Sequence, residues 1–290
     1  MRYISPLRYP GGKARLAPFI SQLIAQQNPR PRYYAEPFAG GAGSALRLLI
    51  DKSVERIYIN DLDPGIAAFW RCVFQDGQEF IKMIHSEEIS IDAWKHHVSV
   101  YGSPEGKSDR ELGFATFFLN RCNRSGILRA RPIGGLDQSG KWKIDARFNR
   151  EALAERVKHL GDFSASVTLA ESDARDFIRD LEMHGTEVLL YVDPPYLIQG
   201  DRLYLDSLTR DDHAELAEVL RNTNLHWLLT YDADERVTEE LYKGFRCAEF
   251  SIFHTAQIQR MGVEYAVFSD SVALPDVSGI IGDDNFRLVG

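Results

Sequence analysis

The chain has 290 residues and a formal net charge of -8, and its hydrophobic fraction of 44% and charged fraction of 26% are typical of a globular protein. This composition excludes a disordered, fibrous or membrane-embedded chain, and the length allows one large α/β domain or a catalytic domain with a smaller insert. No stretch approaches the roughly 18 apolar residues of a membrane span, and the N-terminus lacks a signal-peptide pattern, so we expect a cytoplasmic protein. Three distant cysteines without a CxxC pair predict neither a disulfide framework nor a metal site.

Short β-rich runs alternate with helical patterns along two blocks of the chain. The first block contains candidate strands at residues 33–38 and 56–61, and the second contains SVTLAES, EVLLYVD, LHWLLTYD, RCAEFSIFH and EYAVFSD, with a helical pattern over 210–221. This alternation predicts a doubly wound, Rossmann-like α/β fold with seven strands in a mostly parallel sheet. The last two strands have no helix between them and predict an antiparallel hairpin at one edge.

The first candidate strand runs into EPFAGGAGSALRLL, a glycine turn that opens a helix. Such a turn lets a ligand approach the peptide groups at the helix N-terminus, and an acid at the end of the next strand can bind ribose hydroxyls. Asp61 lies 18 residues beyond Gly43, close to the roughly 20 of that geometry, but the glycines do not follow GxGxxG, which weakens an NAD-binding interpretation. The turn alone also fits a simple tight connection between a strand and a helix.

Residues 77–162 interrupt the alternation and predict an inserted, mainly helical domain. Between Lys95 and Lys158, 13 Lys and Arg oppose 7 Asp and Glu, a net charge of +6, so the rest of the chain carries -14. A positive segment in an acidic protein is typical of nucleic-acid contact, although an unevenly charged solvated surface gives the same pattern. The predicted organisation is a discontinuous catalytic domain over 1–76 and 163–272, the insert over 77–162, and a tail over 273–290.

The fourth candidate strand runs directly into Asp193, Pro194, Pro195 and Tyr196. The two prolines remove two backbone donors and stiffen the chain, which leaves the Pro194 carbonyl as an outward acceptor beside the Asp193 carboxylate. Two acceptors and an aromatic face in one rigid turn suit a planar base with an amino group. If the first and fourth strands are neighbours, the glycine turn and Asp193 face one crevice at the carboxyl edge of the sheet. The alternative is an ordinary strand end with an Asp turn residue.

The motifs RYPGGK, EPFAGGAGS, YINDLD, LNRCNRSGIL, DFIRDL and VDPPY follow one another along the chain. In these motifs and their order, the chain resembles the Dam-type family of DNA adenine-N6 methyltransferases (D12 class, alpha group) over nearly its whole length. The resemblance implies S-adenosyl-L-methionine as the cofactor, double-stranded DNA as the substrate and the insert as a target-recognition domain. It implies a cofactor pocket formed by Tyr9, Lys13, Glu36, Pro37, Phe38, Gly40, Gly43, Asp61 and Asp193. It implies a catalytic site formed by Asp193, Pro194, Pro195 and Tyr196.

Two positions depart from the best-known members of this family. Tyr9 stands where they have Trp, which keeps an aromatic face. Arg124 and Ser125 stand where some members that read GATC place Tyr and Asn, so the recognition sequence does not transfer. Asp173, beyond the third candidate strand, either meets the adenine of the cofactor or caps the helix that follows. We expect the insert to contact DNA through Arg121, Arg124, Ser125, Arg129 and Arg131.

These observations predict a site-specific enzyme that transfers a methyl group to N6 of an adenine flipped out of the duplex. The Asp193 carboxylate and the Pro194 carbonyl would accept hydrogen bonds from N6, and Tyr196 would stack on the base. The alternatives are methylation of cytosine N4, methylation of an RNA base or a protein glutamine, and a DNA-binding relative that no longer catalyses. We expect no membrane partner and no obligate protein partner, and a cognate restriction endonuclease would act separately.

Overall fold

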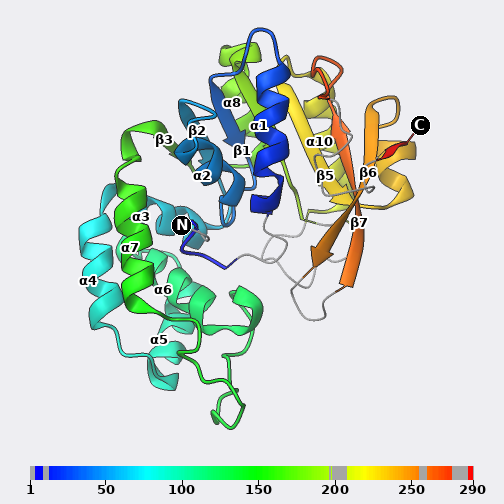
Figure 1. Ribbon diagram of the computed structural model, residues 1–290. Helices are drawn as coiled ribbons and strands as arrows, with labels where there is room; N and C mark the ends of the chain where they lie inside the picture. Colours follow the sequence, from blue (N-terminus) through cyan, green and yellow to red (C-terminus); the bar gives the residue numbers. More distant parts are fainter. Residues whose placement is uncertain are drawn as a thin grey trace. The chain divides into compact units, whose positions relative to one another are not determined.

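The computed structural model describes residues 4–8, 13–195, 197, 208–254, 260–275 and 287–289. Contacts between residues divide the chain into two compact units (Figure 1). The sheet unit comprises Lys13–Leu62 and Ser172–Gly290, and the helical unit comprises Met1–Gly12 and Asp63–Glu171. None of the helices in the described ranges is both long enough and apolar enough to span a membrane.

The sheet unit has a mixed sheet with the strand order β2-β1-β4-β5-β7-β6-β8, in which the neighbouring pairs are parallel from β2 to β5 and antiparallel from β5 to β8. Strand β1 pairs in parallel with β2 and β4, and β4 pairs in parallel with β5. Strand β7 is antiparallel to β5 and β6, so the predicted antiparallel hairpin of β6 and β7 is confirmed. The edge position is not, because β8 pairs antiparallel with β6 and forms the edge of the sheet. The strands are β1 (Tyr33–Glu36), β2 (Arg56–Asn60), β4 (Val188–Val192), β5 (His226–Asp232), β6 (Arg246–His254), β7 (Arg260–Phe268) and β8 (Arg287–Val289).

Helices cover both faces of this sheet, as the doubly wound prediction requires. Right-handed crossovers place α2, between β1 and β2, and α10, between β4 and β5, on opposite faces because the strand order runs in opposite directions from β1 and from β4. Helix α1 packs against α2, and α8 packs against α10. Strand β4 is buried at every position, as expected for a central parallel strand covered on both faces. The helices are α1 (Ala17–Gln26), α2 (Gly43–Ile50), α8 (Ala174–Leu181) and α10 (Arg210–Asn222), with short turns η1 (Lys13–Leu16), η4 (Glu182–Glu187) and η5 (Val237–Leu241).

The helical unit is organised around α6, which packs against α3 and α5, while α4 packs against α7. Aromatic rings form its core: Phe69 stacks on Phe117 with ring centroids 5.9 Å apart, and Phe80 meets both Phe114 and Phe117 edge to face. A capping box between Ser108 and Glu111 starts α6. The elements are α3 (Pro64–Gln75), α4 (Gly77–Ser86), α5 (Ile91–Gly102), α6 (Asp109–Cys122), η2 (Arg124–Gly126), α7 (Arg150–Gly161), η3 (Ser164–Ser166) and β3 (Val167–Ala170).

All seven predicted strands are present in the described residues as β1 to β7, and the short strand β8 was not predicted. The predicted insert, 77–162, is mainly helical in the structure, but the compact helical unit also includes α3 and β3, which belong to the predicted catalytic domain. These two elements contact each other, and α3 packs on α6 and α7. Because compact units are defined by contacts and not by function, the predicted domain boundaries stay a prediction.

Candidate active site

The glycine turn lies between β1 and α2 in the sheet unit. Gly40 has a φ of +45° and Ala42 a φ of +47°, so the chain turns through the left-handed region twice before α2 begins. At Gly43, a Cβ atom would lie 3.0 Å from the Cβ of Ala14, which leaves little room for a larger residue. The Gly40 N–H donates to Asp61 Oδ2 over 2.8 Å, so the acid at the end of β2 reaches the turn directly.

Glu36 ends β1 and is buried, with 5% of its surface exposed. Its Oε1 accepts hydrogen bonds from the Tyr34 hydroxyl at 3.0 Å and from the Ala45 N–H at 2.9 Å. Burial raises the pKa of Glu36 to about 8; the two hydrogen bonds oppose that shift and the nearby charge of Asp193 adds to it. A cationic group placed beside this carboxyl would return it to the ionised form.

Asn60, the last residue of β2, joins three chain segments at this edge of the sheet. Its Nδ2 donates to the carbonyl oxygens of Pro37 at 3.0 Å and Ser172 at 2.9 Å. Its Oδ1 accepts from the Ser172 N–H and hydroxyl at 3.0 and 3.1 Å. The amide is buried and makes four hydrogen bonds, so it fixes the glycine turn and the chain before α8 relative to β2. The sequence did not reveal this role, although Asn60 belongs to the YINDLD motif.

Asp193 follows β4 directly and is half-buried. The Thr230 hydroxyl on β5 donates to Asp193 Oδ1 over 2.7 Å, and the same hydroxyl is 2.9 Å from the Tyr191 hydroxyl. Pairing of Val192 with Leu229 puts Asp193 level with Thr230 across the two strands. Thr230 therefore orients the Asp193 carboxylate, a role that the sequence did not reveal because it depends on strand register. Pro194 is buried and Pro195 half-buried.

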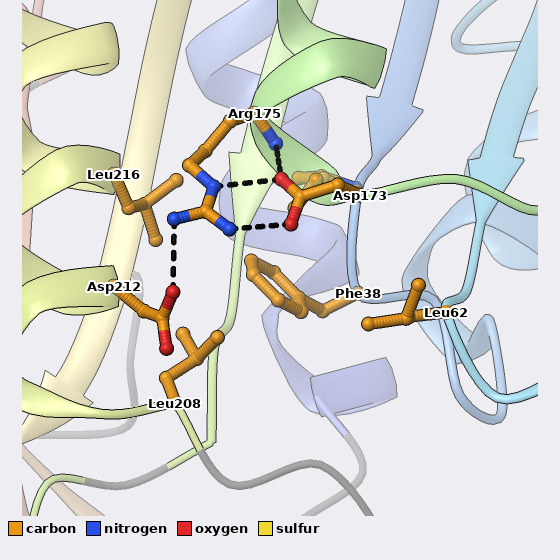
Figure 2. Close-up of a pocket in the computed structure, with 9 residues that line it drawn as sticks. Phe38, Leu62, Asp173, Arg175, Leu208, Asp212 and Leu216 are labelled. Carbon is orange, nitrogen blue, oxygen red and sulfur yellow. Dashed lines mark hydrogen bonds and ion pairs between the residues drawn. The ribbon is translucent and has the colours of Figure 1, made fainter.

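A pocket opens at the same edge of the sheet unit (Figure 2). Figure 2 shows Arg175 between two carboxylates, with Phe38 and Leu62 beside Asp173. Arg175 binds both oxygens of Asp173, at 2.8 and 2.6 Å, and reaches Asp212 on α10 at 2.9 Å. Asp173 also accepts from the Arg175 N–H at 2.8 Å, so the structure shows the helix cap, one of the two alternatives for this residue. The lining residues are Pro37, Phe38, Leu62, Asp173, Ala174, Arg175, Leu208, Asp212 and Leu216.

The structure brings most of the predicted site residues to one edge of the sheet. Glu36, Gly40 and Asp61 meet at the ends of β1 and β2, and the pairing of β1 with β4 sets Asp193 beside them. Pro37 and Phe38 line the pocket, and Gly43 begins α2. Tyr9 and Tyr196 lie outside the described residues, and of Lys13 only the backbone, at the start of η1, is described.

The arginine-rich segment after α6 is held by two buried asparagines of the helical unit. Asn120 binds the backbone of Arg8 from both ends of its amide, at 2.7 Å each, and donates to the Gly126 carbonyl at 2.9 Å. Asn123 donates to the carbonyl oxygens of Ile127 and Leu128 at 3.0 and 2.8 Å. Both belong to the LNRCNRSGIL motif, so this part of the motif fixes the path of the loop.

The predicted DNA-contact residues fall into two groups. Arg121 turns inward: its guanidinium donates to the Arg147 carbonyl at 2.8 Å and to the Pro6 carbonyl at 3.4 Å, and burial, with nearby Arg8, lowers its pKa to about 9. Its geometry is therefore that of a structural residue, and its DNA contact stays a prediction. Ser125 is half-buried with a φ of +57°. Three side chains are exposed at the surface, those of Arg124, Arg129 and Arg131.

A model of the family described as D12 class N6 adenine-specific DNA methyltransferase matches residues 9–261 of the chain. The chain belongs to this family. Membership confirms the predicted reaction, methylation of N6 of adenine in DNA, over the cytosine-N4, RNA and protein alternatives.

This D12 class methyltransferase is 23% identical over 260 residues to the type II methyltransferase M.MjaIII of Methanocaldococcus jannaschii. The matched region covers 82% of this chain and 88% of that protein. The chain is also 22% identical over 253 residues to the retron Ec67 DNA adenine methylase of Escherichia coli, covering 82% of this chain and 80% of that protein. Among solved structures, the rRNA methyltransferase aviRa from Streptomyces viridochromogenes matches with a TM-score of 0.36 and 14% identity, over 91% of this chain and 86% of that one.

Proposed function

We propose that this D12 class methyltransferase binds S-adenosylmethionine at the carboxyl edge of β1, β2 and β4 and methylates N6 of an adenine flipped out of double-stranded DNA. The observation that carries the proposal is the pairing of β1 with β4. It sets the glycine turn and the Asp193 turn side by side at the point where the strand order reverses, where ligands bind in open α/β sheets.

The residues at this edge fit the cofactor in charge and shape. The buried Glu36 carboxyl, whose pKa is about 8, suits a cationic neighbour such as the ammonium group of the methionine moiety. Asp61 at the end of β2 suits ribose hydroxyls, and the apolar faces of Phe38 and Leu62 suit an adenine ring in the pocket. Tyr9, Lys13, Pro37, Gly40, Gly43 and Asp193 complete the proposed cofactor site. When bound, S-adenosylmethionine supplies an electrophilic methyl group on a sulfonium.

The Asp193 turn acts on the target base. The amino lone pair of adenine is delocalised into the ring, so N6 is a weak nucleophile until hydrogen-bond acceptors localise electron density on it. We assign this role to the Asp193 carboxylate and the Pro194 carbonyl, both at the end of β4. Thr230 holds the carboxylate in place before the base arrives. Pro195 stiffens the turn, and Tyr196 stacks on the base.

Flipping the base out of the duplex costs a few kcal/mol, which protein contacts with the DNA must offset. We assign those contacts to the exposed Arg124, Arg129 and Arg131 of the helical unit, together with Arg121 and Ser125, and regard 77–162 as the target-recognition domain. Because one transfer to one base needs one active site, the proposed enzyme acts in the cytosol without an obligate protein partner. A cognate restriction endonuclease would act separately.

Nucleoside mass spectrometry tests this function. Unmethylated DNA incubated with the protein and S-adenosylmethionine should yield N6-methyladenine, whereas an RNA control should not. Asp193→Ala should lower the transfer rate by at least about a hundredfold, because the base loses a charged acceptor. Asp180→Asn, which changes an exposed carboxylate on α8, is the matched control and should be active.

Three outcomes would contradict the proposal. Wild-type turnover by Asp193→Ala would show that the Asp193 carboxylate is not the acceptor for N6. N4-methylcytosine as the product would show that the enzyme methylates cytosine N4 and not adenine N6. A wild-type protein that binds DNA but transfers no methyl group would be the non-catalytic relative.

A further inference from the structure

The end of strand β5 contacts the catalytic turn, residues 193–196, at two places. Thr230 and Asp232 lie two residues apart on β5, so their side chains are on the same face of the sheet. The Thr230 hydroxyl donates to Asp193 Oδ1 over 2.7 Å, at the start of the turn. The Leu197 N–H, directly after the turn, donates to Asp232 Oδ1 over 3.3 Å. Two side chains of one strand therefore hold the chain on either side of the turn.

The prolines leave the turn with few groups by which it can be fixed. Pro194 and Pro195 have no backbone N–H, so the first N–H groups after Asp193 are those of Tyr196 and Leu197. A turn without donors at two successive positions cannot be tied down there by backbone hydrogen bonds. The Leu197 N–H meets a carboxylate, which is a stronger acceptor than a backbone carbonyl. This contact therefore fixes the chain where the stiff part of the turn ends.

Asp232 differs from its neighbour Asp234 in what it binds. The two Asp234 oxygens accept from the Arg236 guanidinium at 2.8 Å each, and the Arg236 N–H donates to Oδ1 at 2.9 Å. Within the described residues, no lysine or arginine forms such an ion pair with Asp232, which is half-buried. Burial raises the pKa of Asp232, and the hydrogen bond from Leu197 opposes that shift. A half-buried carboxylate whose desolvation no ion pair offsets is typical of a functional position.

We propose that Asp232 is a positioning residue for methyl transfer, which fixes the chain directly after Tyr196 and so the stacking face that the turn offers to the target adenine. The proposal rests on the proposed function and adds a second contact from β5 to the catalytic turn. Thr230 positions the acceptor end of the turn, and Asp232 positions its aromatic end. In this role Asp232 touches neither the base nor the cofactor and exchanges no proton during the reaction.

Steady-state kinetics with unmethylated DNA tests the positioning. Asp232→Ala should lower kcat/KM for DNA by about 10-fold to 150-fold, the range expected for one lost hydrogen bond to a charged group. The Kd for S-adenosylmethionine, measured by calorimetry, should stay unchanged, because Glu36 and the glycine turn are held by other contacts. Wild-type kcat/KM in Asp232→Ala would overturn the proposal. Weaker binding of S-adenosylmethionine by a folded Asp232→Ala would also overturn it, because Asp232 would then support the whole sheet edge.

The conservative variant separates an acceptor from a charge. Asp232→Asn keeps a side-chain oxygen for the Leu197 N–H and should restore kcat/KM to within about fivefold of wild type. The matched control is Asp270→Ala, at an exposed acid that follows β7. The end of β7 pairs with the start of β5, so Asp270 lies at the opposite end of the sheet from the turn, and its substitution should change neither kcat nor KM. An Asp232→Asn variant as impaired as Asp232→Ala would overturn positioning through the hydrogen bond.

A double-mutant cycle tests whether Asp232 acts through the aromatic end of the turn. Tyr196→Ala removes the ring, and in that background Asp232→Ala should lower kcat/KM by less than about twofold. Thr230→Val should still lower kcat about tenfold in the same background, because it acts on Asp193. Fully additive losses for Asp232→Ala and Tyr196→Ala would overturn the proposal, because Asp232 would then act independently of the ring.

Hydrogen exchange distinguishes failure of this proposal from failure of the proposed function. Exchange at the Leu197 amide, followed by residue-resolved mass spectrometry, should be slow in wild type and in Asp193→Ala and at least about tenfold faster in Asp232→Ala. An unprotected Leu197 amide in wild type would overturn the positioning proposal, whatever the variants do, and leave the methyltransferase intact. A wild-type protein with a protected amide that forms no N6-methyladenine would instead overturn the proposed function, and with it the catalytic role of the contact.

Discussion

The carboxyl edge of the sheet unit and the arginine-rich loop of the helical unit use polar groups in opposite ways. At the sheet edge, the polar side chains bind one another and the backbone: Asp61 binds the glycine turn, Asn60 makes four hydrogen bonds, and Thr230 binds Asp193. On the loop, buried Asn120 and Asn123 fix the backbone while the cations of Arg124, Arg129 and Arg131 face solvent.

This difference follows from what each region must bind. A reaction centre gains from groups whose positions are set before the substrate arrives, since no reorganisation is then needed during the reaction. A surface that meets a long polyanion gains from cations that are solvated and adjustable, because counterion release supplies much of the affinity. Substitutions at the sheet edge should therefore change turnover or stability. Substitutions of the exposed loop cations should change the affinity for DNA and its dependence on salt concentration.

The largest expected effect concerns the buried carboxyl of Glu36. Its pKa is raised from 4.5 to about 8 by burial, so folding is favoured fully below pH 4.5 and this contribution is lost as pH rises toward 8. Glu36→Gln keeps an acceptor for Tyr34 and Ala45 but does not titrate. Its free energy of unfolding minus that of wild type should therefore increase by about 1.4 kcal/mol per pH unit between pH 5.5 and 7.5.

Urea unfolding at several pH values measures this difference. Glu239→Gln, at an exposed glutamate of the same unit, is the control, and its difference from wild type should stay constant. A constant difference for Glu36→Gln as well would mean that Glu36 is ionised in the folded protein across this range. The sheet edge would then contain a fixed negative charge.

The next effect tests whether the loop depends on its packed backbone. Gly126 has a φ of +78°, and a Cβ atom there would lie 2.4 Å from the Arg8 carbonyl oxygen. Gly126→Ala should lower the free energy of unfolding by about 2 to 3 kcal/mol. Gly106→Ala is the matched control: its φ is +73° but a Cβ meets nothing within 4 Å, so it should cost only about 1 kcal/mol. Equal losses in the two variants would mean that backbone strain alone matters and that Arg8 does not fix the loop.

A smaller effect is expected at Thr230, which we infer positions Asp193 without taking part in the reaction itself. Thr230→Val keeps the shape of the side chain and removes the hydroxyl that binds Asp193. We expect kcat to fall about tenfold, equal to about 1.4 kcal/mol of activation free energy, with the KM for S-adenosylmethionine unchanged. Tyr191→Phe removes the other partner of the Thr230 hydroxyl and should have a smaller effect on kcat. A rise in KM with constant kcat would make Thr230 a binding residue instead.

The sequence was sufficient for the parts of this site that depend on local pattern. Strand and helix alternation, the glycine turn and the rigid Asp193 turn predicted the fold and the edge at which the candidate site lies. Thr230 and Asn60 could not be predicted, because their roles depend on which strands pair and in which register. The DNA contact of Arg121 stays a prediction, but charge counting did not reveal that its guanidinium donates to backbone carbonyl oxygens. A net charge does not tell which cations of a segment point inward.

The smallest expected effect is at Arg175, which tests how far ion pairs set the pocket. Arg175 is 20% exposed at its side chain and holds Asp173 against Asp212 and Glu215. Arg175→Ala should raise the KM for S-adenosylmethionine about threefold and leave kcat unchanged, because Asp173 loses its fixed orientation in the pocket while Asp193 is unaffected. Arg179→Ala, at an exposed arginine one turn along α8, is the control for steady-state kinetics. An equal KM for the two variants would show that binding of S-adenosylmethionine does not depend on Asp173. Only the groups at the ends of β1, β2 and β4 would then form the cofactor site.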